Sequence, residues 1–220
     1  MAMTTMQPWI SKHLSLTDLA EIEAAIASVE TKTSGEVVPM IVRRSVSLRS
    51  APYIAIMAAL SLLFVLALIF QFDFARTDHL VGLVIGVVAA LGLAVATPFL
   101  IPLQKFFTLD GDEDEAAFER AQLEFYQTGI PATEGRTGVL IFVSLFERRA
   151  FILGDESISK RLNQEVWVEI TQAMVNRFKQ KDFKGAFVGA IEAVGTKLAT
   201  EFPRAANDRN ELHDHLIIKE

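Results

Sequence analysis

The chain has 220 residues, with 21 Lys and Arg against 27 Asp and Glu, and a formal net charge of -6. Because a nucleic-acid partner needs a concentrated basic surface, this acidic balance argues against one. The chain has no cysteine, which excludes disulfides and thiolate chemistry.

The first fifty residues predict one helix followed by one strand. Apolar residues recur at helical spacing over Leu16–Lys32, and Ser15 or Thr17 can cap the helix N-terminus. Gly35 supplies the C-terminal stop. The β-branched run Glu36–Val42 then predicts a strand.

Two long apolar stretches follow, Ala51–Phe70 and Leu80–Leu103, separated by the short polar connector Gln71–His79. Neither stretch contains a charged residue, and each has about the 20 residues that a helix needs to cross a bilayer. We therefore predict a two-helix transmembrane hairpin over residues 51–103. The alternative is a buried helical hairpin in a globular core.

Small residues lie on one face of each predicted span: Gly82, Gly86 and Ala90 in the second, Ala55 and Ala59 in the first. In lipid such faces let two helices approach closely. The pattern fits closure of the hairpin or formation of a homodimer equally well.

Basic residues at the outer ends of the hairpin predict its orientation. Arg43, Arg44 and Arg49 precede the first span and Lys105 follows the second, whereas the connector carries only Arg76. Because cytoplasmic flanks carry the excess of Lys and Arg, the soluble parts should face the cytoplasm. The first ten residues show no signal-peptide pattern. The expected location is a cell inner membrane, crossed by more than one span.

The second soluble part predicts a helix, two strands and two more helices. In Val139–Phe146 nearly every residue is apolar, which is typical of a central strand covered on both faces. Residues 1–50 and 104–204 should therefore assemble into one α/β domain, with 205–220 as a polar tail that closes with a short strand at Leu216–Ile218. The expected elements are Asp112–Thr128, Thr137–Glu147, Arg148–Asp155, Gln164–Lys179 and Asp182–Phe202.

The run Thr137–Arg149, followed by Ile152–Glu156, resembles the TPM domain. Three other segments match in order: Thr33–Val38, the stretch from Trp167 to Ala186, and Phe202–Leu212, the last of which looks like the tail of a bacterial membrane-bound subgroup. This family links a thylakoid-lumen acid phosphatase, a photosystem II repair protein and a modulator of acetylcholine receptors. The resemblance implies a mixed sheet with helices on both sides.

The resemblance implies less about chemistry. Some members of the family are acid phosphatases or calcium binders, and the domain often carries an Asp-Asn pair before the Gly-Val-Leu strand. This chain has Arg136 and Thr137 there, a departure that weakens any transfer of a catalytic or metal site.

Three carboxylates are the candidate metal ligands. Glu36 opens the first strand, and Asp155 and Glu156 follow the last strand of the central pair. Hard cations take oxygen ligands, so a divalent cation such as calcium would suit them. The alternative is that Asp155 caps a turn and the two glutamates are solvated. We identify no catalytic residue and expect no other cofactor.

The sequence favours a membrane-anchored interaction module, or a membrane-protein quality-control module, over an enzyme. Its expected partners are the lipid bilayer and a membrane protein. The alternative is a metal-assisted acid phosphatase, which would need an acid, base or nucleophile set that the sequence does not display.

Overall fold

The computed structural model describes residues 7–45 and 110–220. Residues 1–45 and 114–220 cluster as one compact unit. The predicted hairpin, with its small-residue faces, lies outside the described residues. Within the described residues, no helix combines the length and the apolar character needed to cross a bilayer.

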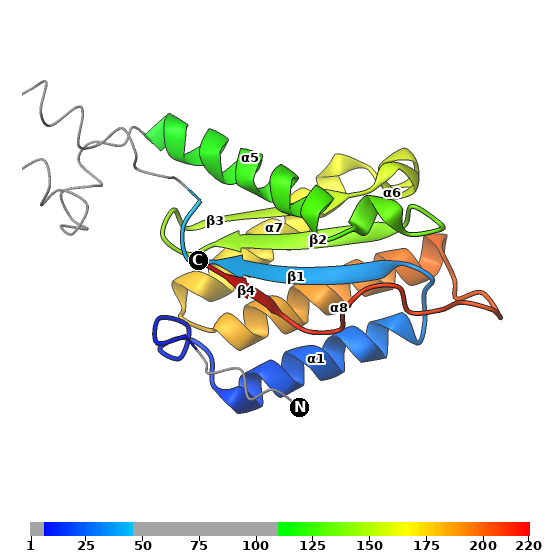
Figure 1. Cartoon of the computed structure of the whole chain (residues 1–220), viewed down its shortest axis with the longest axis horizontal. Helices are drawn as coiled ribbons and strands as arrows, with labels where there is room; N and C mark the ends of the chain where they lie inside the picture. The colour runs from blue at the N-terminus through cyan, green and yellow to red at the C-terminus, as the bar shows by residue number, and fades with distance from the viewer. Residues whose placement is uncertain (1–6, 46–109) are drawn as a thin grey trace, which may run out of the picture. The chain divides into compact units, whose positions relative to one another are not determined.

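A four-stranded mixed sheet forms the centre of this unit, in the order β3-β2-β1-β4 (Figure 1). The strand β1 (Glu36–Val42) pairs in parallel with β2 (Gly138–Ser144) and with β4 (Ile217–Lys219). The strand β3 (Arg149–Gly154) is antiparallel to β2. Two segments about a hundred residues apart therefore share one sheet, which confirms the predicted assembly.

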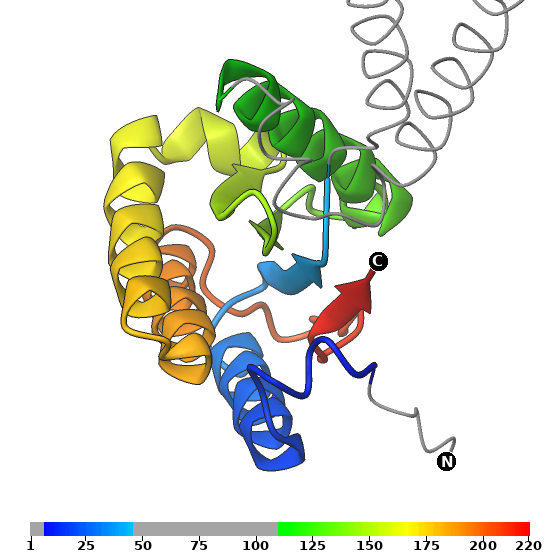
Figure 2. The same ribbon diagram turned by 90° about the vertical axis from the view of Figure 1, so that its left-hand side faces the viewer.

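Helices cover both faces of the sheet, which Figure 2 shows in a view toward the strand ends. On one face, α1 (Leu16–Glu30), α7 (Gln164–Lys179) and α8 (Phe183–Glu201) pack against the larger core. On the other, α5 (Asp110–Gln127) contributes to a smaller core with the short 3-10 helix η2 (Ile130–Ala132). The predicted α/β fold with a mixed sheet and helices on both sides is thus confirmed.

Successive side chains of a strand point to opposite faces of the sheet and so enter different cores. Ile41 and Ile141 face the larger core, whereas Met40 and Phe142 face the smaller one. All seven residues of β1 and all seven of β2 are buried, so both strands are central, as the apolar run predicted.

Local capping fixes where several helices begin. Ser15 and Asp18 form a reciprocal capping box at the start of α1, which satisfies two backbone N–H groups. Asp182 caps α8 by accepting a hydrogen bond of 2.9 Å from the Gly185 N–H. The helix α6 (Glu156–Arg161) follows β3 and has six residues, too few to show a helical period in the sequence.

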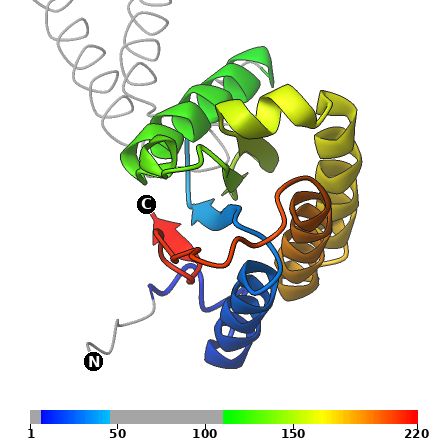
Figure 3. The same ribbon diagram turned by 90° about the vertical axis from the view of Figure 1, so that its right-hand side faces the viewer.

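The segment between α8 and β4 crosses the end of the sheet where β1 begins (Figure 3). The N–H of Ser34 donates to the Phe202 carbonyl at 3.1 Å, and the Ala205 N–H donates to Ser34 Oγ at 2.9 Å. The tail is therefore part of the domain, because β4 adds a strand to the sheet beside β1.

Candidate functional site

The three predicted carboxylates lie at one edge of the sheet, where β1 and β2 begin and β3 ends. Glu36 pairs with Gly138 in the register of β1 and β2, and the Asp155 N–H donates to the Gly138 carbonyl at 2.9 Å. Glu156 is the first residue of α6. The edge is therefore shared, but the side chains have different partners.

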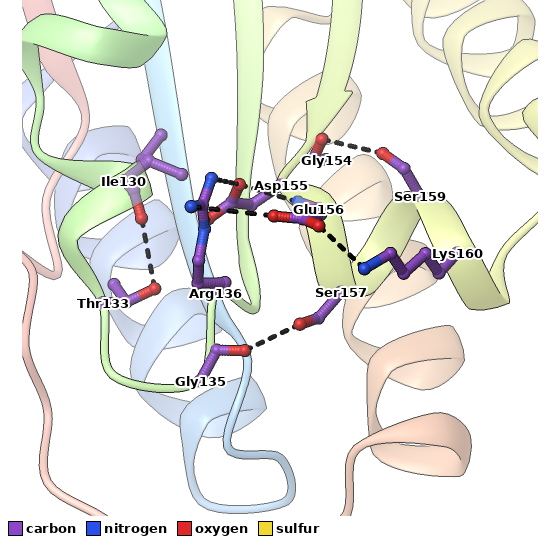
Figure 4. A network of polar contacts seen from close by, with 10 residues as sticks. All are labelled: Ile130, Thr133, Gly135, Arg136, Gly154, Asp155, Glu156, Ser157, Ser159 and Lys160. Atoms are coloured by element: carbon purple, nitrogen blue, oxygen red, sulfur yellow. Dashed lines mark hydrogen bonds and ion pairs between the residues drawn. The ribbon is translucent and has the colours of Figure 1, made fainter.

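Asp155 is held by an arginine. The Arg136 guanidinium donates to both of its carboxylate oxygens, from Nε at 3.2 Å and Nη2 at 3.0 Å (Figure 4). Asp155 also caps α6, since Oδ1 accepts the Glu156 N–H at 2.6 Å. Arg136, the residue that departs from the family pattern, thus neutralises the buried carboxylate beside it.

Glu156 is exposed and contacts Lys160 at 2.7 Å and Arg136 at 3.7 Å. The hydrogen bond from Lys160 and its charge lower the pKa of Glu156. The capping role expected as an alternative for Asp155 is therefore observed, and Glu156 is solvated.

Glu36 is buried like Asp155, with 6% of its surface exposed, but its Oε1 accepts a hydrogen bond from the backbone N–H of Glu211 at 3.0 Å. It lines a separate small cavity with residues from α1 and the tail. Among the described residues, no group of three or more acidic or histidine side chains is arranged to hold a metal ion. Glu36, Asp155 and Glu156 do not form such a group, and their role as metal ligands stays a prediction.

A larger groove lies at the opposite edge of the sheet, with a volume of about 910 Å³. Its walls come from the segment before α1, the β2–β3 turn and the α7–α8 turn. Among the described residues no carboxylate lines it, whereas five cationic side chains do, in a chain of net charge -6. They are Lys12, Arg148, Arg149, Lys179 and Lys181.

The floor of the groove is apolar and aromatic. Phe183 packs against Phe178, with ring centroids 5.2 Å apart, and against the His13 ring at 4.5 Å. Burial, helped by the charge of Lys12, lowers the pKa of His13. His13 is therefore neutral at neutral pH and contributes an aromatic surface rather than a charge.

Two of the cations occupy strained backbone positions. Arg148 has φ +58° and Lys181 has φ +63°, which is the left-handed region that favours glycine. The described residues contain only one other non-glycine residue with positive φ, Arg136. The β2–β3 turn and the α7–α8 turn therefore each contain a cationic residue in a backbone conformation that costs free energy. Such strain often occurs at functional positions.

The chain leaves the described domain beside this groove. Ser45, the last described residue after β1, donates from Oγ to Ser144 Oγ at 2.8 Å and from its N–H to Glu147 at 3.1 Å. Arg149 pairs with Asp114 near the start of α5. Both segments that lead to residues 46–109 are thus tied to groove residues.

The uncharged polar side chains of the groove have structural partners. The hydroxyl of Ser144 donates to the buried carboxylate of Glu147, not to a histidine, and His13 packs on aromatic rings. No nucleophile–base pair is therefore assembled among the described groove residues. Sequence reasoning missed the groove because its cations come from three distant segments.

Comparison with known proteins supports the fold. The model of the TPM domain matches residues 105–197, which confirms the resemblance. A solved structure titled "NMR structure of BA42 protein from the psychrophilic bacteria Bizionia argentinensis sp. nov." aligns with a TM-score of 0.58 and 21% identity, over 93% of this chain and 94% of that one. A search of curated proteins finds no match.

Proposed function

We propose that the chain, which matches the TPM domain and has a cationic groove, is a membrane-anchored interaction module. The groove binds an acidic segment of a membrane-protein partner, and the predicted hairpin over residues 51–103 holds the domain at the bilayer. A quality-control role would follow if that partner is bound only when it is unassembled or damaged.

The observation that carries this proposal is the charge of the groove. Lys12, Arg148, Lys179 and Lys181 form no ion pair with any described residue, so they are free to meet an anionic ligand. The apolar floor formed by Phe178 and Phe183 adds area for the stems of the ligand's side chains.

The position of the groove supports a membrane partner. Five residues separate Ser45 from Ala51, the start of the predicted first span, and they reach at most roughly 20 Å. A partner whose acidic segment lies just outside the bilayer is therefore within range of the groove.

A photo-crosslinking amino acid at Val175, which lines the groove, tests this proposal in native membranes. We expect a discrete adduct with a membrane protein that weakens about tenfold in a Lys179→Gln, Lys181→Gln variant, since rim charges govern encounter. The control is Lys32→Gln, Lys197→Gln, which removes the same charge outside the groove. An adduct of equal yield in both double variants would exclude the groove as the binding site.

The alternative, a metal-assisted phosphatase, has one favourable feature, since the groove cations suit a phosphoryl group. The acidic side chains lie at the other end of β1 and β2, however. Glu36 is opposite Gly138 and Val42 is opposite Ser144, so about 20 Å of strand separates the two ends. A metal near Glu36 is too far away to activate a phosphoryl group in the groove.

We therefore expect negligible phosphatase activity from the purified protein, with or without a divalent metal. The measurement is release of inorganic phosphate from a small phosphomonoester. Metal-dependent turnover that disappears in a folded Asp155→Ala variant would reverse the ranking of the two functions.

A further inference from the structure

The strand β3 forms one edge of the sheet, since the strand order is β3-β2-β1-β4 (Figure 1). Its antiparallel register with β2 determines which of its backbone groups are already used. The Asp155 N–H donates to the Gly138 carbonyl, and these two residues continue the register in which Gly154 is opposite Val139. Asp155 and Gly138 are therefore a hydrogen-bonded pair, and such pairs alternate with non-hydrogen-bonded pairs along the ladder.

This alternation directs the backbone groups of Ala150 and Ile152 away from β2, whereas those of Phe151 and Leu153 face it. The next outward carbonyl, that of Gly154, accepts the Ser159 hydroxyl of α6 at 3.0 Å. Among the described residues, none forms a hydrogen bond with the outward N–H and C=O groups of Ala150 and Ile152. The edge from Ala150 to Ile152 can therefore still pair with another strand.

The two edges of the sheet differ in the features that discourage such pairing. The strand β4, at the other edge, has only three residues and ends at Lys219. Short edge strands and lysines are common protections against strand addition. The strand β3 has six residues with no lysine or proline, and its one charged residue, Arg149, is paired with Asp114. Only the edge at β3 is therefore suited to add a strand.

The groove leads to this edge. Ala150 lines the groove together with Arg148 and with Val175 of α7. On the α5 side, Phe118 packs against Phe151 of β3 with ring centroids 5.5 Å apart and is still 40% exposed. An extended segment is the shape that can contact the groove cations, the apolar side chains and the outward backbone groups together.

We propose that the acidic segment of the partner binds as an added strand along β3, with its acidic residues in the groove and its backbone hydrogen-bonded to Ala150 and Ile152. This inference rests on the proposed function and adds how the partner is recognised. Main-chain hydrogen bonds supply affinity, whereas the cations and the apolar side chains select alternate residues of the segment. The partner therefore presents an extended segment in which acidic residues adjoin a β-branched run, not an acidic helix.

The test is amide hydrogen exchange of the purified full chain in detergent micelles, measured residue by residue with NMR. The probe is a short acetylated peptide in which an Asp-Glu pair adjoins alternating Val and Thr. With the peptide bound, exchange at the Ala150 and Ile152 amides should slow at least about tenfold, because both become hydrogen-bonded. The Phe151 and Leu153 amides are the internal control, since β2 already protects them.

Two N-methylated peptides test the backbone bonds without any change to the protein. Methylation of every second residue removes the N–H groups from one edge of the bound strand, and moving the methyl groups by one residue removes them from the other edge. One of these peptides should bind at least about tenfold more weakly than the parent peptide, and the other about equally well, because only one edge faces β3. Replacing Asp-Glu with Asn-Gln should also weaken binding, since the groove cations lose their partner.

Ala150→Pro is the matching protein variant, because proline removes the outward N–H and leaves the ladder with β2 intact. Ala150→Val is its control, since it enlarges the same side chain and keeps the N–H. We expect the affinity for the peptide to fall at least about tenfold in the proline variant alone.

Peptide binding that leaves exchange at Ala150 and Ile152 unchanged would overturn strand addition and leave the groove as the binding site. Equal affinity of the two methylated peptides, or equal loss in the two Ala150 variants, would also overturn it. Absence of peptide binding would overturn this inference, and the adduct from Val175 in membranes would then tell whether the proposed function fails with it. Protection of the same amides without peptide, rising with protein concentration, would instead assign the edge to a second copy of the chain.

Discussion

At the scale of single residues, the unusual positions are charged groups where the fold does not favour them. Lys181 and Arg148 adopt left-handed backbone in turns that glycine would fill at lower cost. Glu36 and Glu30 sit where burial opposes their charge. Each of these residues lines either the groove or the smaller cavity at Glu36.

Lys181→Gly should separate stability from binding. Glycine relieves the left-handed backbone, so the free energy of unfolding should rise by about 1 kcal/mol, while loss of a groove cation should weaken the crosslink from Val175. Chemical denaturation and adduct yield are the two measurements. Lys179→Gly is the comparison, because glycine in the last turn of α7 should destabilise the fold by a similar amount. A Lys181→Gly variant that loses stability would refute the strain argument.

Glu30 should make stability fall as the pH rises. Its pKa is about 8 in the folded chain against 4.5 ordinarily, so the fold favours the protonated form. That contribution is fully present below about pH 4.5 and is lost as the pH passes through about 8. Thermal unfolding at several pH values should show a flatter profile in Glu30→Gln. Glu23→Gln, an exposed change on the same helix, should keep the parent profile; if it flattens the curve equally, Glu30 is not the cause.

At the scale of elements, the stability of the domain depends on β2. It is hydrogen-bonded on one side to β1 and on the other to β3, and its side chains enter both cores. The groove lies where β2 ends, and the smaller cavity at Glu36 lies beside the start of its partner β1.

Ile141→Asp should unfold the domain or cost several kcal/mol, since it places an unpaired charge at a fully buried position of β2. Val168→Asp is the control, because Val168 on α7 is 61% exposed and the change should cost less than about 1 kcal/mol. Limited proteolysis and thermal unfolding measure both. An Ile141→Asp variant as resistant as the parent would contradict the central position of β2.

At the scale of the whole molecule, the two cavities have opposite charge and lie at opposite ends of β1 and β2. The cationic groove borders Ser45, from which the chain leads to residue 46, whereas residues of the tail line the smaller cavity at Glu36. The proposed binding of an anionic partner in the groove therefore leaves the cavity at Glu36 untouched.

The orientation of the chain is the prediction that belongs to this scale. Because Lys and Arg flank the outer ends of the predicted hairpin, both termini should be cytoplasmic and Gln71–His79 should be on the far side. Reporter fusions after Glu220 and within Gln71–His79 measure this directly. Activity of a reporter that works only outside the cytoplasm, fused after Glu220, would contradict the predicted orientation.

The sequence by itself determined the elements and their layers. The apolar run Val139–Phe146 predicted a central strand, and helical spacing in Gln164–Lys179 predicted α7 with the bounds that the structure has. These features are visible in a sequence because burial on a fixed face imposes a period. The TPM resemblance rested on such segments and is confirmed.

Only the tertiary structure decided where the charged side chains meet. Lys12, Arg148 and Lys181 come from three turns or loops, which have no period to reveal that they share one groove. The sequence left Asp155 as a metal ligand or a cap, and only the fold shows Arg136 against it and the tail in contact with Glu36. Contacts between distant segments depend on how the chain closes in space, and no local pattern encodes them.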